Sequence, residues 1–282
     1  MTLYTVYKES SSLRTRHPAC PSPKVPANDA RDGWEYLSSL RTLKKTFREG
    51  NDGGVVLDTI RANFGPGPVS FLDVGCADGL FVRRAKDLLH LTGIKLSVTA
   101  IDPLPAAVLS TVRQLPVDAV YRTRFEDFSP GAKFDVINVR HSLYYLRDPV
   151  RQVARMTDLV KPGGLLTFTL WGRNCDLYRV YGATRTESAD ADPYPITAED
   201  LGTLVKGNTS LCDVRCCLSI GGINLSAWRG SEDVLRSVYL VLRRQLDPPV
   251  RDGDVDLFRS RFERLTLTGQ RIVAVITCRK VA

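Results

Sequence analysis

The stretch that decides the fold runs from Val69 to Leu89 and reads VSFLDVGCADGLFVRRAKDLL. An apolar run reaches the carboxylate of Asp73, and the turn GCADG and an amphipathic segment follow. Near-continuous apolar strands that alternate with amphipathic helices are typical of a parallel sheet covered by helices on both faces. Such sheets bind ligands at the carboxyl ends of their strands, so Asp73 and the turn after it are candidates for a binding site.

The same alternation of apolar and amphipathic segments continues along the chain. We predict strands over 69–75, 95–102, 118–125, 134–140, 165–171, 216–225 and 271–278, and helices over 80–93, 104–115, 148–164 and 231–246. Asp148 is the predicted cap of the third of these helices, and Thr197 with Asp200 resembles a capping box. The fold class is therefore α/β, with a Rossmann-like, doubly wound and mostly parallel seven-stranded sheet.

Two further features set the predicted domain organisation. Residues 34–64 show two helical periods before the breaker GPGP, and a helical segment of 224–267 separates the last two strands. We expect residues 1–67 to be an N-terminal segment with a helical lid and residues 68–282 to be the main domain. The insertion 224–267 is expected to shape a ligand pocket.

Composition narrows the class of protein. Of the 282 residues, 43% are hydrophobic and 25% are charged, as in soluble globular proteins. No apolar run reaches the roughly 20 residues of a membrane span, and the N-terminus has no apolar signal core, so we predict no membrane association and a cytoplasmic location. Seven cysteines favour free thiols, and LCDVRCCL at 211–218 is interpreted as a partly buried strand rather than a zinc site.

The acids around the first turn restrict the ligand. Asp73 and Asp78 would repel a pyrophosphate, and the chain lacks both the GxGxxG spacing and a P-loop lysine there. Carboxylates at this place suit a ligand that carries positive charge and no phosphate. S-adenosylmethionine is such a ligand, because it has an ammonium, a sulfonium and ribose hydroxyls.

The motifs of this region resemble those of class I S-adenosylmethionine-dependent methyltransferases. FLDVGCADG resembles the first motif of the family, with Ala77 in place of a glycine, and LVKPGGLL resembles the turn before the fifth strand. RFEDF lies where the family has its adenine-binding loop, although Arg124 stands where an Asp is frequent. The resemblance implies S-adenosylmethionine as cofactor, with Asp102 binding both ribose hydroxyls. The implied cofactor-binding residues are Asp73, Gly75, Cys76, Gly79, Asp102, Pro103, Phe125, Glu126 and Arg140.

The loop after the fourth strand, NVRHSLYYLRDP, is the predicted acceptor side. His141 is the candidate general base because the pKa of histidine lies near working pH, and the alternative is a histidine that only hydrogen-bonds the ligand or the backbone. Tyr144, Tyr145, Trp171 and Tyr178 are candidate substrate-binding residues, although Trp171, Tyr178 and Trp228 could equally belong to the core.

The predicted reaction is methyl transfer to a small-molecule acceptor, most simply at an amine nitrogen in specialised metabolism. Residues 135–282 have a more distant resemblance to the histamine N-methyltransferases. The markers of base-methylating enzymes and of metal-dependent catechol O-methyltransferases are absent, so we predict no metal and no nucleic-acid acceptor. The Arg surplus, including Arg140 and Arg173, allows the alternative of O- or C-methylation of a carboxylate-bearing metabolite such as an amino or keto acid. The alternative from another functional class is an RNA- or protein-binding module that retains the cofactor fold. The sequence defines no oligomeric state.

Overall fold

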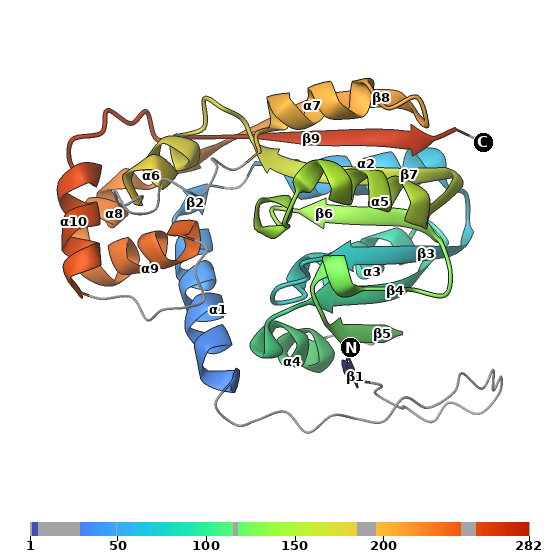
Figure 1. The fold of residues 1–282 in the computed structure, drawn as a ribbon, viewed down its shortest axis with the longest axis horizontal. Coiled ribbons are helices and arrows are strands. Elements are labelled where there is room, and N and C mark those ends of the chain that lie inside the picture. Colours follow the sequence, from blue (N-terminus) through green and yellow to red (C-terminus); the bar gives the residue numbers. More distant parts are fainter. Residues whose placement is uncertain are drawn as a thin grey trace.

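The protein forms a single mixed sheet with helices on both faces. The computed structural model describes residues 2–4, 29–48, 50–114, 118–184, 196–243 and 252–281. Within these residues nine strands pair in the order β1-β5-β4-β3-β6-β7-β9-β8-β2 (Figure 1). The predicted α/β class and its mostly parallel core are confirmed.

Five parallel strands make the centre of the sheet. They are β3 (Gly67–Val74), β4 (Ile94–Asp102), β5 (Ala119–Arg122), β6 (Phe134–Arg140) and β7 (Val160–Trp171). The chain runs outward from β3 through β4 to β5 and then returns to place β6 on the other side of β3. The strand order therefore reverses between β3 and β6, and this is the point where open α/β sheets bind their ligands.

Antiparallel strands complete the sheet. β9 (Gln270–Lys280) pairs with β7, and β8 (Leu211–Ile223) pairs with β9. These seven strands are the predicted ones. Two short edge strands, β1 (Thr2–Tyr4) and β2 (Phe47–Arg48), pair with β5 and β8 and were not predicted. Segments of two or three residues carry no hydrophobic period, so only their partners reveal them.

Two separate apolar clusters cover the two faces of the sheet. On one face α2 and α3 pack Val56, Ile60 and Val82 against Phe71 and Val136. On the other face the buried side chains of α5 and α7 join those of β6, β7 and β9. The helices on these faces are α2 (Asp52–Asn63), α3 (Leu80–His90), α4 (Pro105–Gln114), α5 (Pro149–Leu159) and α7 (Ala198–Lys206).

The remaining helices gather beyond the carboxyl ends of β3 and β6 (Figure 1). They are α1 (Asp29–Lys45), α6 (Asp176–Thr184), α8 (Leu225–Gly230), α9 (Glu232–Arg243) and α10 (Asp252–Phe262). α9 packs against both α1 and α6, so the N-terminal helix and the helices between β8 and β9 share one core. The helical insertion therefore lies where the sequence placed it, and its role in a pocket stays a prediction.

Local signals in the sequence mark several helix ends correctly. The side chain of Asp148 accepts a hydrogen bond from the backbone N–H of Arg151, and Thr197 with Asp200 forms the predicted capping box. The helix predicted over 148–164 ends earlier, because α5 stops at Leu159 and β7 already begins at Val160. Pro162 lies just inside that strand, where it cannot donate a backbone hydrogen bond to continue a helix.

Candidate functional site

The carboxyl ends of β3 and β4 bring together the two predicted cofactor acids. Asp73 and Asp102 are 4% and 6% exposed. The two carboxylate oxygens of Asp102 accept hydrogen bonds from the backbone N–H groups of Ala77 and Leu104, at 3.0 and 2.9 Å. Burial raises the pKa of Asp73 and the pKa of Asp102 to about 6 each. Burial disfavours the ionised form of both acids, and a bound cation or hydroxyl groups would stabilise that form. The two acids are therefore candidates for binding such a ligand.

A polar row across three strands holds Asp73 in place. Asn138 donates from Nδ2 to Asp73 at 2.7 Å, and Thr167 donates from Oγ1 to Oδ1 of Asn138 at 2.8 Å. The three residues are register partners on β3, β6 and β7. The Thr167 hydroxyl thus occupies the amide oxygen of Asn138 and directs its NH₂ group to Asp73. The sequence analysis missed Asn138 and Thr167, because their alignment depends on which strands pair.

The turn after β3 needs its glycines. Gly75 has a φ of +78°, and a Cβ at this position would lie 2.4 Å from the Cβ of Ser142. Gly79 has a φ of +73° where α3 begins. Ala77, which stands where the resembled family has a glycine, also lies in the left-handed region with a φ of +48°. The turn therefore needs a glycine at Gly75 for its close approach to Ser142, and it holds Ala77 at a strained φ.

Four other predicted cofactor residues lie around this edge with their side chains differently engaged. The side chain of Cys76 is buried and accepts a hydrogen bond from Thr111 at 3.4 Å. The ring of Phe125 is buried, Glu126 accepts the backbone N–H of Arg147 at 2.6 Å, and Pro103 is exposed. The side chains of Cys76 and Phe125 therefore serve the core.

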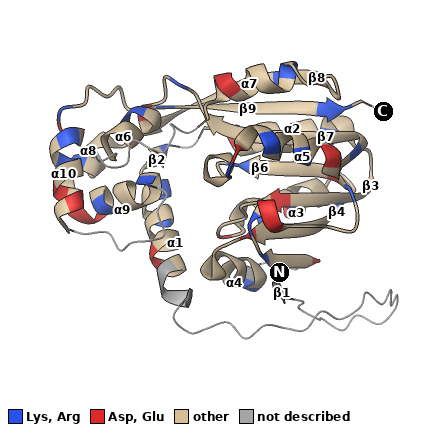
Figure 2. Ribbon diagram, viewed as in Figure 1, with Lys and Arg blue, Asp and Glu red and all other residues tan. Residues whose placement is uncertain are grey.

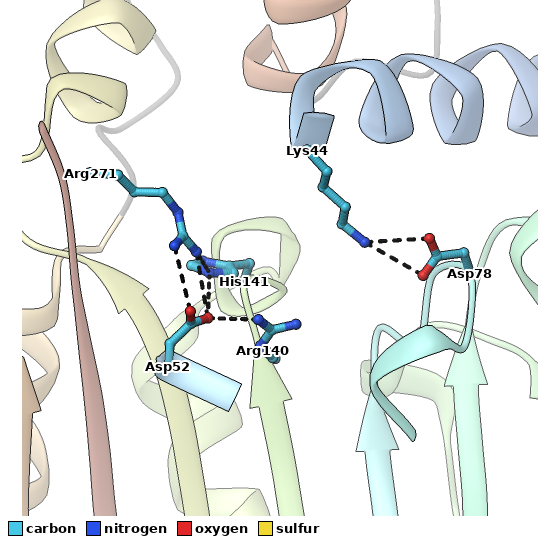
Figure 3. A network of polar contacts seen from close by, with 6 residues as sticks. All are labelled: Lys44, Asp52, Asp78, Arg140, His141 and Arg271. Carbon is cyan, nitrogen blue, oxygen red and sulfur yellow. Dashed lines mark hydrogen bonds and ion pairs between the residues drawn. The ribbon is translucent and has the colours of Figure 1, made fainter. Parts of the chain in front are cut away.

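A charged cluster of Asp52, Arg140, His141 and Arg271 lies beyond the end of β6 (Figure 3). Nη2 of Arg140 lies 2.7 Å from Oδ2 of Asp52, and Nη1 and Nη2 of Arg271 lie 3.5 Å from its two oxygens. Burial alone would raise the pKa of Asp52. The contacts with His141 and the two guanidinium groups outweigh it and hold that pKa well below its usual range. Asp52 is therefore a buried carboxylate that stays ionised.

His141 is neutral in this cluster. Nη2 of Arg271 lies 3.2 Å from its Nε2 atom. The same nitrogen lies 3.9 Å from Oδ2 of Asp52. Because a guanidinium only donates, the shorter contact with Arg271 favours the tautomer in which Nε2 accepts and the ring proton is on Nδ1. Burial lowers the pKa of His141 to about 4, helped by the charges of Arg271 and Arg140 and opposed by Asp52. The predicted general base thus has one lone pair engaged by Arg271. Asp52 and Arg271 were not found from the sequence, since neither lies in a recognisable motif.

Lys44 joins α1 to the turn after β3. Its Nζ atom lies 3.4 and 3.5 Å from the two carboxylate oxygens of Asp78 (Figure 3). Burial lowers the pKa of Lys44, and Asp78 partly restores it. A helix from the N-terminal segment therefore lies over the predicted cofactor turn. The sequence analysis did not single out Lys44.

The predicted aromatic residues separate into two groups. Tyr144 and Trp171 are buried and stacked with ring centres 4.5 Å apart, and the hydroxyl of Tyr144 accepts the backbone N–H of Trp171. Tyr145 is exposed on one side, and its hydroxyl lies 2.6 Å from that of Tyr36 on α1. Tyr144 and Trp171 thus lie next to the ring of His141, with ring centres 6.4 Å from its centre. Tyr145 instead contacts the N-terminal helix α1.

The last candidates lie on α6, α8 and β8. Tyr178 is partly buried on α6, and Trp228 is fully buried with its Nε1 donating to Thr46. Cys212, Cys216 and Cys217 are exposed on β8. Over the described ranges no three His, Cys, Asp or Glu side chains are placed to hold a metal ion. No helix in that part of the chain has the length and apolar character to cross a membrane.

Comparison with known families gives a match over much of the chain. Residues 34–207, more than half of the chain, match the family described as "Methyltransferase domain". This range contains Lys44, Asp52, the turn after β3 and the end of β6.

Curated relatives are similar over part of the chain. The ubiquinone biosynthesis O-methyltransferase of Aromatoleum aromaticum is 29% identical over 146 residues, which are 51% of this chain and 59% of the relative. The enzyme of the same name from Coxiella burnetii is 32% identical over 117 residues, which are 40% of this chain and 48% of the relative. The chain thus spans about half the length of these relatives.

Solved structures share the fold over most of the chain. BH2331 of Bacillus halodurans C-125 has a TM-score of 0.53 at 13% identity and covers 81% of this chain and 98% of its own. The [4+2]-cyclase SpnF also has a TM-score of 0.53, at 18% identity, with 92% and 98% covered. Identities this low show the fold alone. Because a cyclase shares it, the chemistry has to be argued from the site.

Proposed function

Because the chain belongs to the methyltransferase domain family, we propose that it transfers the methyl group of S-adenosylmethionine to a small-molecule acceptor. The observation that carries the proposal is the pair of buried acids, Asp73 and Asp102, at the ends of adjacent parallel strands. Both border a glycine turn tight enough for close backbone approach. An amine nitrogen as the accepting atom stays a prediction from the sequence.

The residues present fit the proposed cofactor. Each oxygen of Asp102 accepts one backbone N–H and keeps a second lone pair for a hydroxyl, which suits vicinal ribose hydroxyls. Asp73 is a buried carboxylate whose ionised form a nearby ammonium would stabilise. The guanidinium of Arg140 acts electrostatically on both Asp73 and Lys44, so it lies within reach of this site. Its positive charge suits the carboxylate of the cofactor's methionine part, while Asp73 suits the ammonium. When bound, S-adenosylmethionine supplies an electrophilic methyl group on a sulfonium.

The geometry supports a hydrogen-bonding role for His141 rather than the general-base role. Nε2 accepts from Arg271, and Nδ1 carries the ring proton. A ring in this state offers an N–H donor to an acceptor molecule. Water would then remove the proton from the accepting atom. An acceptor that is already deprotonated would need no base.

The distribution of charge supports a small molecule over a nucleic acid. Among the described residues, Lys and Arg are spread over many elements and alternate with Asp and Glu (Figure 2). A nucleic-acid footprint would gather the basic residues in one patch or stripe. The net charge of +8 is therefore interpreted as a property of the whole surface.

Thermal unfolding with S-adenosylhomocysteine tests the proposal. The ligand should raise the Tm of the full chain by mass action, and Asp102→Ala should remove this shift. Asp58→Ala, which changes an exposed acid on α2, is the control and should keep it. An unchanged shift in Asp102→Ala would refute the ribose assignment. Stabilisation by RNA that weakens with salt, without any ligand shift, would favour the binding-module alternative.

A further inference from the structure

Buried hydrogen-bond donors without acceptors are concentrated at one place in the described part of the chain. Eight buried side-chain polar atoms have no partner there. Three of them, Nε of Arg140, Nδ1 of His141 and Nε of Arg271, belong to the charged cluster. Two more are the hydroxyls of Thr169 and Ser219 on the strands beside it. Most of the unmet hydrogen bonding therefore surrounds a single site.

These five residues lie on the same face of the sheet end. Thr169 is the register partner of Arg140, and His141 donates its backbone N–H to Thr169. A Cβ on Gly50 would lie 2.4 Å from Oγ of Ser219 and 3.6 Å from Nη1 of Arg271, so Ser219 and Arg271 are neighbours. The surroundings of the cluster thus belong to one region beyond β6, β7, β8 and β9.

All five groups can donate, and the two arginine Nε–H groups can only donate. The Nε–H groups of both arginines have no lone pair, and Nδ1 of His141 holds the ring proton when Nε2 accepts from Arg271. Buried donors without acceptors are destabilising, and native proteins rarely leave several together. The group that completes this site therefore presents lone pairs rather than hydrogens.

Arg271 is the cation of the cluster that can bind a further anion. Asp52 lies 2.7 Å from Arg140 but 3.5 Å from both terminal nitrogens of Arg271, so its closer partner is Arg140. Arg140 is also within electrostatic reach of Asp73. The side chain of Arg271 is only 7% exposed. Arg271 thus shares the single carboxylate of Asp52 with Arg140 and lies at the longer distance from it. A second anion would stabilise this buried guanidinium.

The fold fixes the chain that carries Arg271. Asp176, fully buried on α6, accepts with one oxygen from the backbone N–H groups of Thr268, Gly269 and Gln270, at 2.9, 2.7 and 3.1 Å. These three residues immediately precede Arg271 and follow the helical insertion. The insertion therefore returns to the sheet at a defined position, with Arg271 at the edge of the site.

We infer that Arg271 and the donors around it bind a carboxylate on the methyl acceptor. The inference rests on the proposed function and names its substrate class. The carboxylate would lie beyond β6 and β9, near Arg140, whose charge also acts on Asp73, so it belongs to the reacting molecule. An accepting amine would then be part of a molecule that also carries a carboxylate, as in an amino acid.

Calorimetric titration of the full chain saturated with S-adenosylhomocysteine tests this. The probes are two pairs of carboxylate and neutral isostere: benzoate with benzamide, and acetate with acetamide. At least one carboxylate should bind about 10-fold or more tightly than its amide. Arg271→Gln should remove this preference. Arg84→Gln should keep it, because Arg84 is an exposed arginine on α3.

The outcomes separate the inference from the proposed function. Equal affinity for each carboxylate and its amide would overturn the inference and leave water as the partner of these donors. A preference that survives Arg271→Gln would overturn it as well. If Arg271→Gln fails to fold, Asp52→Asn combined with Arg271→Gln removes both buried charges and takes its place. Loss of S-adenosylhomocysteine binding by the unchanged chain would instead contradict the proposed function.

Discussion

Nη2 of Arg271 lies 3.2 Å from Nε2 of His141, although their strands are not neighbours and β7 lies between them. The contact forms because His141 follows the end of β6 while Arg271 lies near the beginning of the antiparallel strand β9. It engages the lone pair that a general base would use. This contact supports our proposal that His141 donates a hydrogen bond to the acceptor, in place of the general-base role predicted from the sequence.

Substitutions at His141 distinguish these two roles. An asparagine amide nitrogen can take the place of Nδ1 as a donor, so His141→Asn should keep kcat/KM within about 10-fold of the unchanged enzyme. His141→Phe removes the donor and should lower kcat/KM roughly 10- to 100-fold. The measurement is turnover of an active acceptor between pH 6 and 8, where the pKa of about 4 keeps His141 neutral.

The pH profile supplies the control for this comparison. The profiles of the unchanged enzyme and of His141→Asn should run parallel, because a neutral His141 contributes no titration in this range. If His141→Asn loses as much activity as His141→Phe, and only the histidine enzyme shows a titration, His141 is the base after all.

Asp73→Asn should stabilise the ligand-free chain at pH 7.5 while weakening cofactor binding. Burial raises the pKa of Asp73 from 3.8 to about 6. The protonated carboxyl therefore contributes stability below about pH 4, and that contribution is lost as pH rises through 6. Removing the ionised group should raise the free energy of unfolding by roughly 3 kcal/mol at pH 7.5, because one unit of pKa corresponds to about 1.4 kcal/mol. Urea unfolding at pH 7.5 and 4.5 measures this.

The gain from Asp73→Asn should shrink towards pH 4.5, because Asp73 is then mostly protonated in the folded chain. Asp58→Asn, at an exposed acid, should show no such pH dependence. An equal gain at both pH values would mean that ionisation of Asp73 is not the cause.

Thr167→Val tests whether the polar row positions Asp73. Valine keeps the shape of threonine but cannot donate to Asn138, whose amide is then free to turn. Affinity for S-adenosylhomocysteine should fall about 5-fold, since the cost of a lost hydrogen bond is about 1 kcal/mol. Thr203→Val, on the exposed face of α7, should leave the affinity unchanged. An unaltered affinity in Thr167→Val would show that Asp73 needs no such support.

Ala77→Gly should stabilise the chain by about 0.5–1 kcal/mol. Ala77 has a φ of +48°, where a Cβ destabilises the folded chain by about 1–2 kcal/mol. Glycine removes this strain but loses more backbone entropy on folding, which offsets part of the stabilisation. The backbone N–H that Ala77 donates to Asp102 is kept. Urea unfolding measures the change, and Ala154→Gly on the exposed face of α5 should be destabilising instead. A loss of stability in both variants would contradict strain at Ala77.

Much of the fold followed from local pattern. The apolar strands and amphipathic helices between Val69 and Trp171 predicted a parallel sheet, and Asp148 and Thr197 marked helix starts correctly. The family match confirms the resemblance to S-adenosylmethionine-dependent methyltransferases, and with it the cofactor at the level of the family. Asp73 and Asp102 could be located because parallel strands place their carboxyl ends at one edge.

The sequence by itself determined the sheet, its binding edge and the acids on it, because hydrophobic period and turn chemistry are local properties of the chain. Only the tertiary structure decided which side chains meet there. Asp52, Arg140 and Arg271 lie on three separate elements, and the bond between Asn138 and Asp73 needs β6 to pair with β3. Long-range pairing brings such groups into hydrogen-bond distance, and burial then sets the ionisation of Asp73 and His141.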